Sequence, residues 1–315
     1  MGGPRGATSC AVRGIPAWLR RPSSLRGQES GHGSVLWPAG HRPVVVGVIN
    51  VTPDSFSDGG RFLSAEAARA RIDRLVEEGA DVIEVGGEST RPAGATYGRG
   101  YAPVDAATQM ARTLPAIEHA AKRAVSVAID TTLPEVARAA LEAGATIVND
   151  VSCLGDPALA RECAAAGAWF VLMHSRPGAV STWTDVIGEA SVEWAAARDR
   201  AVAEGVPSER IVMDPGLGFG KGADDNLAVL AGLSRFHALG HPLYVGPSRK
   251  AFIGVCEERD DLSRSPADER VGGTVAACLA AARAGAAVLR VHDVRALRQA
   301  LAVEAAIEHA ASGGA

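Results

Sequence analysis

Short apolar runs alternate with Ala-rich stretches along the chain from residue 43 onward. Each run has the length of a β-strand, and many contain β-branched residues, so each predicts a buried strand. The eight runs cover residues 44–50, 81–86, 125–130, 146–150, 169–174, 211–214, 243–246 and 287–292.

The segments between these runs have helical patterns, for example at residues 65–78, 134–143, 185–204 and 268–284. Four joints between a helical pattern and the next run contain a Gly followed by Ala, at Gly79, Gly144, Gly167 and Gly285. Gly suits the left-handed backbone conformation just past the end of a helix. Repeated helix–Gly–strand joints predict βα units and a parallel sheet.

Eight such units favour a (β/α)8 TIM barrel, an α/β fold in which a single domain spans residues 43–312. A doubly wound open sheet is the alternative that the pattern leaves open. Residues 1–42 have a different texture, with Arg scattered among Gly, Pro and Ser and no apolar core of signal-peptide length. We expect this segment to be a disordered N-terminal extension, with an organelle transit peptide or an upstream start codon as alternatives.

Nearly every apolar run ends in a polar residue. In a barrel of parallel strands these ends meet at the C-terminal mouth, where active sites lie. A single Asp at a strand end usually caps the next helix, but polar ends on all eight runs indicate a ligand site suited to a polar heterocycle and a polyphosphate. The polar ends include Asn50, Glu84, Asp130, Asn149, Asp150, His174, Asp214, Ser248, Lys250, Arg290 and His292.

Composition narrows the classes of function. The chain has 315 residues and a net charge of −4, so a broad basic surface for nucleic acid is not expected. The sequence contains no run of about 18 apolar residues, so a membrane span is not expected. The five cysteines are scattered and contain no Cys-x-x-Cys pair, which is typical of reduced thiols in a cytoplasmic protein rather than of disulfides or a zinc site.

The loop after the first run reads Asn-Val-Thr-Pro-Asp-Ser-Phe-Ser-Asp-Gly-Gly over residues 50–60. This string resembles the signature that opens the dihydropteroate synthase family of pterin-binding barrels. The resemblance implies that Asn50 binds Mg²⁺ through its amide oxygen, and Mg²⁺ commonly takes few protein ligands together with substrate phosphates. It also implies that Ser55 and Asp58 help close the loop over a diphosphate, and that Phe56 forms a wall for the second substrate.

The stretch Gly-Gly-Glu-Ser-Thr-Arg-Pro at residues 86–92 resembles the second loop of the same family. Thr90, Arg91 and Pro92 are carried over as substrate-binding or loop-closing residues, with the Arg91 fork facing the diphosphate. The family usually continues directly into a helix, whereas residues 93–103 here form a longer Gly-rich segment.

Three strand ends match the family motifs that surround the pterin. A carboxylate can accept two neighbouring donors from the pyrimidine edge, and an amide can both donate and accept, which is the interpretation of Asp130, Asn149 and Asp214. Asp214 opens the string Asp-Pro-Gly-Leu-Gly-Phe-Gly-Lys, in which Phe219 is expected to contact substrate. The glycines of this string lack the P-loop spacing, and we expect them to let backbone approach a flat ring.

The last two motifs are Ser-Arg-Lys at residues 248–250 and Arg-Val-His-Asp-Val at residues 290–294. The resemblance implies that Ser248 and Lys250 contact substrate and that Lys250 borders both the pterin and the amine pocket. Alternation along a strand puts Arg290 and His292 on one side, where they can bracket a diphosphate.

Two positions depart from the family pattern. Ala251 stands where many relatives have a Ser whose hydroxyl meets the carboxylate of p-aminobenzoate. The residues after His174 also differ from the usual pattern, and His174 itself is interpreted as a buried, hydrogen-bonded histidine rather than a catalyst.

The resemblance covers roughly residues 43–305. It implies the condensation of 6-hydroxymethyl-7,8-dihydropterin diphosphate with p-aminobenzoate, with Lys250, Arg91, Asp58, Arg290 and His292 as the catalytic residues and Mg²⁺ as cofactor. A homodimer is a further family expectation. Two alternatives stay open, a catalytically degenerate pterin-binding paralogue and a pterin-dependent corrinoid methyltransferase.

Overall fold

The computed structural model describes residues 42–51, 65–88, 104–123, 125–176, 182–257 and 264–311. The expected extension over residues 1–42 lies outside these ranges except for Arg42. Residues 52–64 and 89–103, which hold most of the two family loops after the first and second strands, lie outside them as well.

The eight strands form one parallel sheet in the order β6-β5-β4-β3-β2-β1-β8-β7, and a bridge between Met213 and Leu243 joins the two ends of this order. The sheet therefore closes on itself, which confirms the TIM barrel and excludes the open sheet. The strands are β1 Val44–Asn50, β2 Val82–Gly86, β3 Ser126–Asp130, β4 Ile147–Asp150, β5 Trp169–Met173, β6 Ile211–Asp214, β7 Tyr244–Val245 and β8 Val288–Val291.

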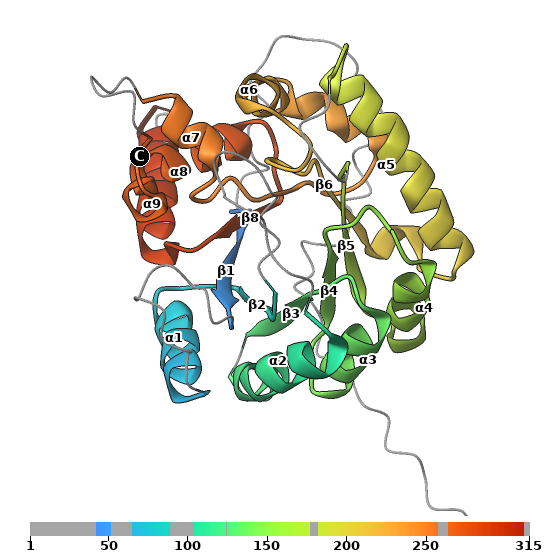
Figure 1. Ribbon diagram of the computed structural model, residues 1–315. Helices are drawn as coiled ribbons and strands as arrows, with labels where there is room; N and C mark the ends of the chain where they lie inside the picture. Colours follow the sequence, from blue (N-terminus) through green and yellow to red (C-terminus); the bar gives the residue numbers. More distant parts are fainter. Residues whose placement is uncertain are drawn as a thin grey trace, which may run out of the picture.

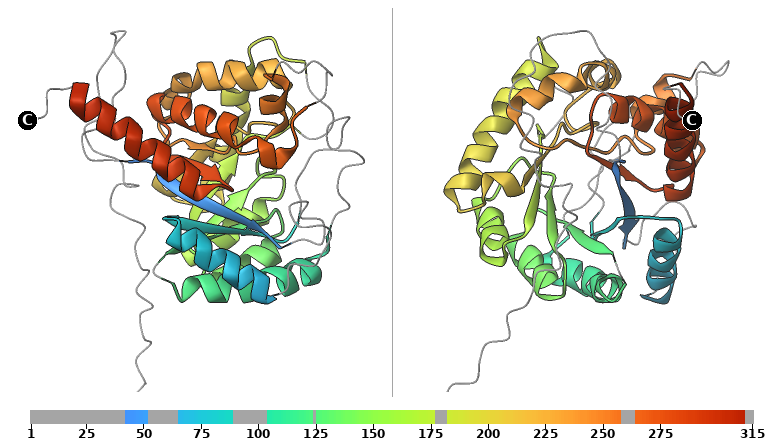
Figure 2. Two further views of the ribbon diagram at one scale, coloured as in Figure 1. Left: turned by 90° about the vertical axis from the view of Figure 1, so that its left-hand side faces the viewer. Right: turned by 180° about the vertical axis from the view of Figure 1, so that it is seen from behind.

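Helices surround the sheet on the outside, as Figure 1 shows. They are α1 Ala65–Glu77, α2 Ala106–Ala121, α3 Pro134–Glu142, α4 Pro157–Ala166, α5 Val186–Ala203, α6 Ala223–Ala231, α7 Ala251–Val255, α8 Val271–Arg283 and α9 Val294–Ala311, with 3₁₀ turns at Ser208–Arg210, Leu233–Leu239 and Ala267–Glu269. The last helix, α9, lies beside α8 and passes β1 (Figure 2).

Strand β7 is shorter than the apolar run predicted. Only Tyr244 and Val245 have strand structure, although the run extends over residues 243–246. Pro242 and Pro247 flank this run, and neither has an N–H to donate to a neighbouring strand. The barrel is consequently closed by few backbone contacts between β6 and β7.

The helix–Gly–strand joints have the predicted backbone. The φ angles of Gly79, Gly144, Gly167 and Gly285 are +95°, +113°, +61° and +89°. A residue with a Cβ adopts such angles only with strain, which explains why Gly recurs where each of these helices ends.

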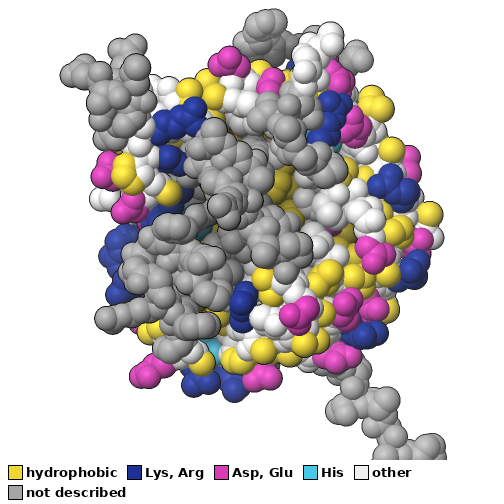
Figure 3. Space-filling view, viewed as in Figure 1, with side chains coloured by type: hydrophobic (Ala, Val, Ile, Leu, Met, Phe, Trp, Pro, Cys, Tyr) yellow, Lys and Arg dark blue, Asp and Glu magenta, His cyan; other side chains and the backbone are white. Residues whose placement is uncertain are grey.

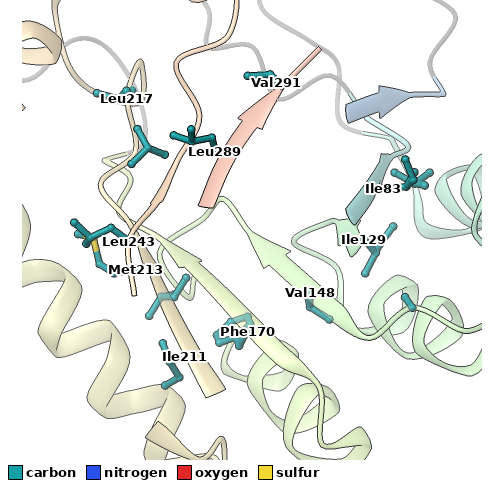
Figure 4. Packing of buried hydrophobic residues seen from close by; sticks show 14 of the residues in the cluster. Ile83, Ile129, Val148, Phe170, Ile211, Met213, Leu217, Leu243, Leu289 and Val291 are labelled. Carbon is teal, nitrogen blue, oxygen red and sulfur yellow. The ribbon is translucent and has the colours of Figure 1, made fainter. Parts of the chain in front are cut away.

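The apolar side chains form two layers, one on each face of the sheet. The larger layer fills the space between strands and helices and includes Ile83, Ile129 and Phe170 (Figure 4). The smaller layer lies inside the barrel and consists of Val44, Val46, Val82, Ala128, Ile147, Val171, Val212, Tyr244 and Val288. Residues alternate between the two faces along each strand. A polar residue two positions after an interior apolar residue therefore also points into the barrel.

The surface and helix lengths are those of an ordinary globular chain. In the face shown in Figure 3, acidic and basic side chains are interspersed among neutral and apolar ones. None of the helices in the described ranges combines the length and the hydropathy that crossing a bilayer requires.

The Trp194 side chain on α5 anchors the outer layer, and its replacement should be costly. Trp194 is fully buried and its Nε1 donates to the Leu172 carbonyl at 2.7 Å. Trp194→Ala should lower the free energy of unfolding by about 3–5 kcal/mol, measured by urea denaturation. Val192→Ala on the same helix is the matched control, because Val192 is 72% exposed and its change should stay within about 0.5 kcal/mol. Equal losses for the two variants would contradict this account.

Candidate active site

Polar side chains line the barrel interior just above the inner apolar layer. Asp130, Asn149 and Asp214 each lie two residues after an interior residue of the same strand, namely Ala128, Ile147 and Val212. The two-residue period of a strand therefore turns all three side chains into the mouth. Their exposed fractions are 6%, 2% and 4%, so each needs a hydrogen-bond partner in the protein or in a ligand.

An ion pair crosses the interior below these residues. The Arg290 Nε atom donates to Glu84 Oε1 at 2.6 Å, and its Nη2 atom donates to Asp130 Oδ2 at 3.1 Å. The Asn149 Nδ2 atom donates to the other carboxylate oxygen of Glu84 at 3.2 Å. These contacts bring together side chains from β2, β3, β4 and β8.

Two acceptor atoms in this group have no partner within the described part of the chain. They are Asp130 Oδ1 and Asn149 Oδ1, and both are buried. A buried acceptor without a donor costs free energy, so a pair of them is an arrangement that a ligand with neighbouring N–H donors would stabilise.

The Asp130 carboxyl is easier to protonate than an ordinary Asp. Burial and the charge of Glu84 raise its pKa to about 7, although Arg290 opposes the shift. Asp150 and Glu88 add smaller effects in the same upward direction. Near neutral pH the empty site therefore holds Asp130 as a mixture of acid and carboxylate.

Asp214, Lys250 and Phe219 form the other side of the mouth. Burial raises the pKa of Asp214, and its Oδ1 accepts from the Gly216 amide at 2.7 Å. Desolvation lowers the pKa of Lys250 to about 8, while the Asp214 charge acts against that shift. The Lys250 ammonium donates to the Leu217 carbonyl and lies 5.0 Å from the centre of the Phe219 ring. The structure thus places these three predicted residues around one space.

The Gly-rich string after Asp214 has a packing role that the sequence interpretation missed. A Cβ on Gly216 would lie 1.8 Å from the His174 carbonyl oxygen, and φ there is +68°. The loop thus needs Gly216 to pack against the end of β5, a reason that is independent of any flat ring in the site.

Lys221 links the same loop to His174 through hydrogen bonds. Its buried Nζ lies 2.9 Å from His174 Nδ1 and 3.1 Å from the Gly216 carbonyl, while His174 Nε2 lies 3.0 Å from a carboxylate oxygen of Glu193. Burial lowers the pKa of His174 to about 4, so the ring is neutral and can accept from Lys221. His174 is buried and hydrogen-bonded, and its contacts are those of a structural residue.

Ser248 and His292 are in direct contact. The Ser248 hydroxyl lies 2.9 Å from His292 Nδ1 and accepts from the His292 amide at 3.2 Å. Between Ser248 and Lys250, Arg249 has a φ of +59° and turns outward to a two-bond ion pair with Asp293, at 3.0 and 2.7 Å. The ion pair supports this uncommon backbone, which turns Arg249 away from the side chains on either side of it.

Asn50 lies at the tip of β1, opposite Gly86 in the parallel register. A Cβ on Gly86 would approach Asn50 Oδ1 to 3.0 Å, so Gly at this position leaves room beside the amide oxygen. An amide oxygen of this kind fits Mg²⁺, which keeps several waters and needs few protein ligands. The described residues contain no cluster of three or more His, Cys, Asp or Glu side chains that would hold a metal by themselves.

Six of the sequence-predicted residues lie outside the described ranges: Ser55, Phe56, Asp58, Thr90, Arg91 and Pro92. Their roles stay predictions. The sequence interpretation counted Glu84 among the polar strand ends but gave it no specific role, and it assigned none to Tyr244 or Lys221. The structure places all three under the mouth.

The site combines an acceptor-rich wall with cations at its rim. Asp130, Asn149 and Asp214 suit the donor edge of a polar ring, and Lys250, Arg290 and His292 suit an anionic group attached to it. Both features lie at the C-terminal end of the strands, where TIM-barrel enzymes act.

Comparisons with known proteins identify the family of this chain. A family model described as pterin binding enzyme matches residues 46–292. A dihydropteroate synthase of Mycobacterium leprae is 43% identical over 273 residues, which are 84% of this chain and 94% of the relative. A solved Xanthomonas albilineans dihydropteroate synthase with 4-aminobenzoic acid has a TM-score of 0.76 at 42% identity, with 85% of this chain and 93% of that chain covered. The enzyme from the same organism in complex with 7,8-dihydropteroate has a TM-score of 0.73 at 40% identity, covering 85% and 94%. The chain therefore belongs to the dihydropteroate synthase family of pterin-binding enzymes.

Proposed function

We propose that this chain is a dihydropteroate synthase, a transferase that joins 6-hydroxymethyl-7,8-dihydropterin diphosphate to p-aminobenzoate. The products are 7,8-dihydropteroate and diphosphate. The observation that carries the proposal is the pair of buried acceptors without partners in the described chain, Asp130 Oδ1 and Asn149 Oδ1, in the same mouth as Asp214. A pterin edge supplies the neighbouring N–H donors that these acceptors require.

The reaction needs positioning and charge stabilisation rather than a protein nucleophile. The arylamine nitrogen forms a bond to the pterin methylene carbon, the diphosphate leaves with the electron pair of the C–O bond, and the amine releases a proton. The acceptors hold the ring so that its methylene group faces the rim. Arg290 and His292 would stabilise charge on the departing group, and Ser248 holds the His292 ring in place.

The proposal includes Mg²⁺ at Asn50. A bound Mg²⁺ would supply positive charge to the diphosphate as it leaves. Asn50 would hold it through its amide oxygen, beside the space that Gly86 leaves open. The sequence expectation that Asp58 and Arg91 complete this end of the site belongs to the same proposal.

We also propose a cytoplasmic homodimer. Val303 and Ile307, one turn apart on α9, are 55% and 64% exposed, and such side chains suit a partner surface. Cys153, Cys163, Cys256 and Cys278 are free thiols, as a reducing compartment favours. Sedimentation of the purified chain as a monomer would contradict the dimer.

A turnover assay with both substrates tests the proposed function. The wild type should form 7,8-dihydropteroate only when Mg²⁺ is present. Asn50→Ala should weaken binding of the pterin diphosphate far more than binding of 6-hydroxymethylpterin, because only the former presents phosphate oxygens to the metal. Calorimetry with the two ligands separates these effects. Equal weakening of both would count against Asn50 as the metal ligand, and pterin binding without turnover would favour the degenerate paralogue.

Pterin binding should depend on pH through Asp130. The folded, empty site keeps Asp130 protonated up to its pKa of about 7, whereas the ring donors require the carboxylate. Affinity for 6-hydroxymethylpterin should thus rise about tenfold per pH unit up to that pKa and level off above it, with one proton released on binding. Calorimetry in two buffers of different ionisation enthalpy, between about pH 5.5 and 7.5, measures both quantities.

Asp130→Asn is the control for this pH dependence. It keeps Asp214, whose pKa burial also raises, so the difference between the two pH profiles isolates Asp130. A wild-type affinity that stays constant across this range would refute the assignment.

Ala251 should affect the binding of p-aminobenzoate. Ala251 is the first residue of α7 and follows Lys250 directly. Ala251→Ser would add a hydroxyl where the p-aminobenzoate carboxylate is expected, and a hydrogen bond to a charged group should lower the KM for p-aminobenzoate by about tenfold. The KM for the pterin diphosphate should change little. If the wild type shows no turnover and Ala251→Ser restores none, the synthase proposal fails.

A further inference from the structure

Glu84 accepts hydrogen bonds from three side chains beneath the mouth. It is 1% exposed, and its Oε1 accepts from Arg290 Nε at 2.6 Å. Its Oε2 accepts from the Tyr244 hydroxyl at 2.7 Å and from Asn149 Nδ2 at 3.2 Å. Both carboxylate oxygens are therefore occupied, by donors from three other strands.

The chemistry of Glu84 decides which way the Asn149 amide faces. An ionised carboxylate beside a guanidinium can only accept hydrogen bonds, so the NH₂ end of Asn149 must point toward Glu84. The amide oxygen is then turned away from Glu84, and it is one of the two buried acceptors that lack a partner within the described chain. Arg290, held by the other oxygen of Glu84, occupies Asp130 Oδ2 and leaves Asp130 Oδ1 as the second such acceptor.

Tyr244 holds the Oε2 side of this carboxylate. Its ring belongs to the inner apolar layer, and its hydroxyl reaches Glu84 across the barrel from β7. Burial and the Glu84 charge raise the pKa of Tyr244 well above its ordinary value, so the hydroxyl stays protonated and available as a donor. A cavity of about 30 Å³ lies beside both residues and is otherwise lined mainly by apolar side chains such as Val46, Val82 and Val212.

The surroundings of that cavity explain why a Tyr is useful at this position. The cavity is large enough for a water, but a water needs two to four polar partners, and apart from Glu84 and Tyr244 the lining side chains are aliphatic or aromatic. Without the Tyr244 hydroxyl, Glu84 Oε2 would keep its hydrogen bond from Asn149 Nδ2 and would otherwise border apolar surface. The carboxylate would then be less firmly held.

We propose that Glu84 and Tyr244 are positioning residues that set the hydrogen-bonding polarity of the mouth. By fixing the Asn149 amide and the Arg290 guanidinium, they leave Asn149 Oδ1 and Asp130 Oδ1 as acceptors for the ligand. The site thereby selects a heterocycle that has N–H donors facing these two atoms over one that has a carbonyl facing them. This inference rests on the proposed function, because the selected ring is the pterin, but neither residue contacts the reacting atoms.

The test compares two rings that differ at one position. 6-Hydroxymethylpterin carries an amino group at C2, and its 2-oxo analogue, 6-hydroxymethyllumazine, carries a carbonyl there. Glu84→Gln allows the Asn149 side-chain amide to flip by 180°, because a Gln amide can donate to the Asn149 oxygen. The dissociation constant of the lumazine divided by that of the pterin, both measured by calorimetry, is the selectivity ratio. This ratio should fall by about tenfold or more in Glu84→Gln.

Tyr244→Phe keeps the ring and removes only the hydroxyl, so it is the milder variant. It should lower the same ratio by about two- to fivefold, since one donor to Glu84 is lost while Asn149 and Arg290 remain. In the Glu84→Gln background, Tyr244→Phe should add little, because the two residues act through one carboxylate. Additive effects would place Tyr244 outside this chain of contacts.

Asp81→Asn is the matched control. Asp81 forms ion pairs with Arg298 and, at 3.2 Å, with Arg42, and its carboxylate accepts from the Val45 amide at 2.9 Å. It makes none of the contacts that line the mouth. Its replacement should lower the melting temperature while leaving the ratio of dissociation constants unchanged. If Glu84→Gln weakens the binding of both ligands by the same factor, Glu84 is merely structural and the inference is overturned.

A second measurement needs no ligand and so separates this inference from the proposed function. The side-chain NH₂ signals of Asn149 in the ¹⁵N spectrum, assigned by their loss in Asn149→Asp, report the hydrogen bond to Glu84. They should shift in Glu84→Gln and, to a smaller extent, in Tyr244→Phe, and should stay unchanged in Asp81→Asn. Unmoved signals in Glu84→Gln would overturn the positioning role even if the wild type binds pterin. Signals that shift in Glu84→Gln, together with a wild type that binds no pterin, would refute the proposed function and leave the positioning role intact.

Discussion

The ion pair between Arg290 and Glu84 in the barrel interior is the contact on which the site depends. Arg290 also reaches Asp130, so one guanidinium lies between two carboxylates that are almost fully buried. Removing one partner of such a group leaves an uncompensated charge, which costs far more than an exposed pair does. The same contacts leave one oxygen of Asp130 and one of Asn149 available to a ligand, and thereby join the integrity of the interior to its chemistry.

The barrel separates stability and function along its axis. Its floor is filled by apolar side chains such as Val82, Val212 and Val288. The polar residues Glu84, Asp214 and Arg290 follow two positions later on the same strands. Because the strand period is two, the polar residues share the interior face with the apolar floor. Water is excluded from below, so hydrogen bonds and charges in the mouth act in a medium of low dielectric constant.

Within the described part of the chain, the loops after β6 and β7 at the rim of the site are tightly packed. Lys221 holds the loop after β6 against His174, and Gly216 permits that approach. The Arg249–Asp293 pair supports the uncommon backbone between Ser248 and Lys250. One motif can therefore contain residues of two kinds. In Ser-Arg-Lys, Ser248 and Lys250 belong to the candidate site, whereas Arg249 supports the loop through its ion pair with Asp293.

The sequence by itself determined the class of fold and most of the residues at the mouth. Local patterns suffice for this: strand-length apolar runs, Gly at helix ends, and one polar residue at the end of each strand. Closure of the barrel then brings Asp130, Asn149, Asp214 and Arg290 together with no further information. What only the tertiary structure decided is which of these polar atoms bind each other and which remain for a ligand. Tyr244 and Glu84 are 160 positions apart in the chain, and their contact follows from the register and diameter of the closed barrel, which no local pattern encodes. The same holds for Gly216, because the carbonyl that excludes a side chain there belongs to His174, which directly follows β5 and is 42 positions earlier in the chain.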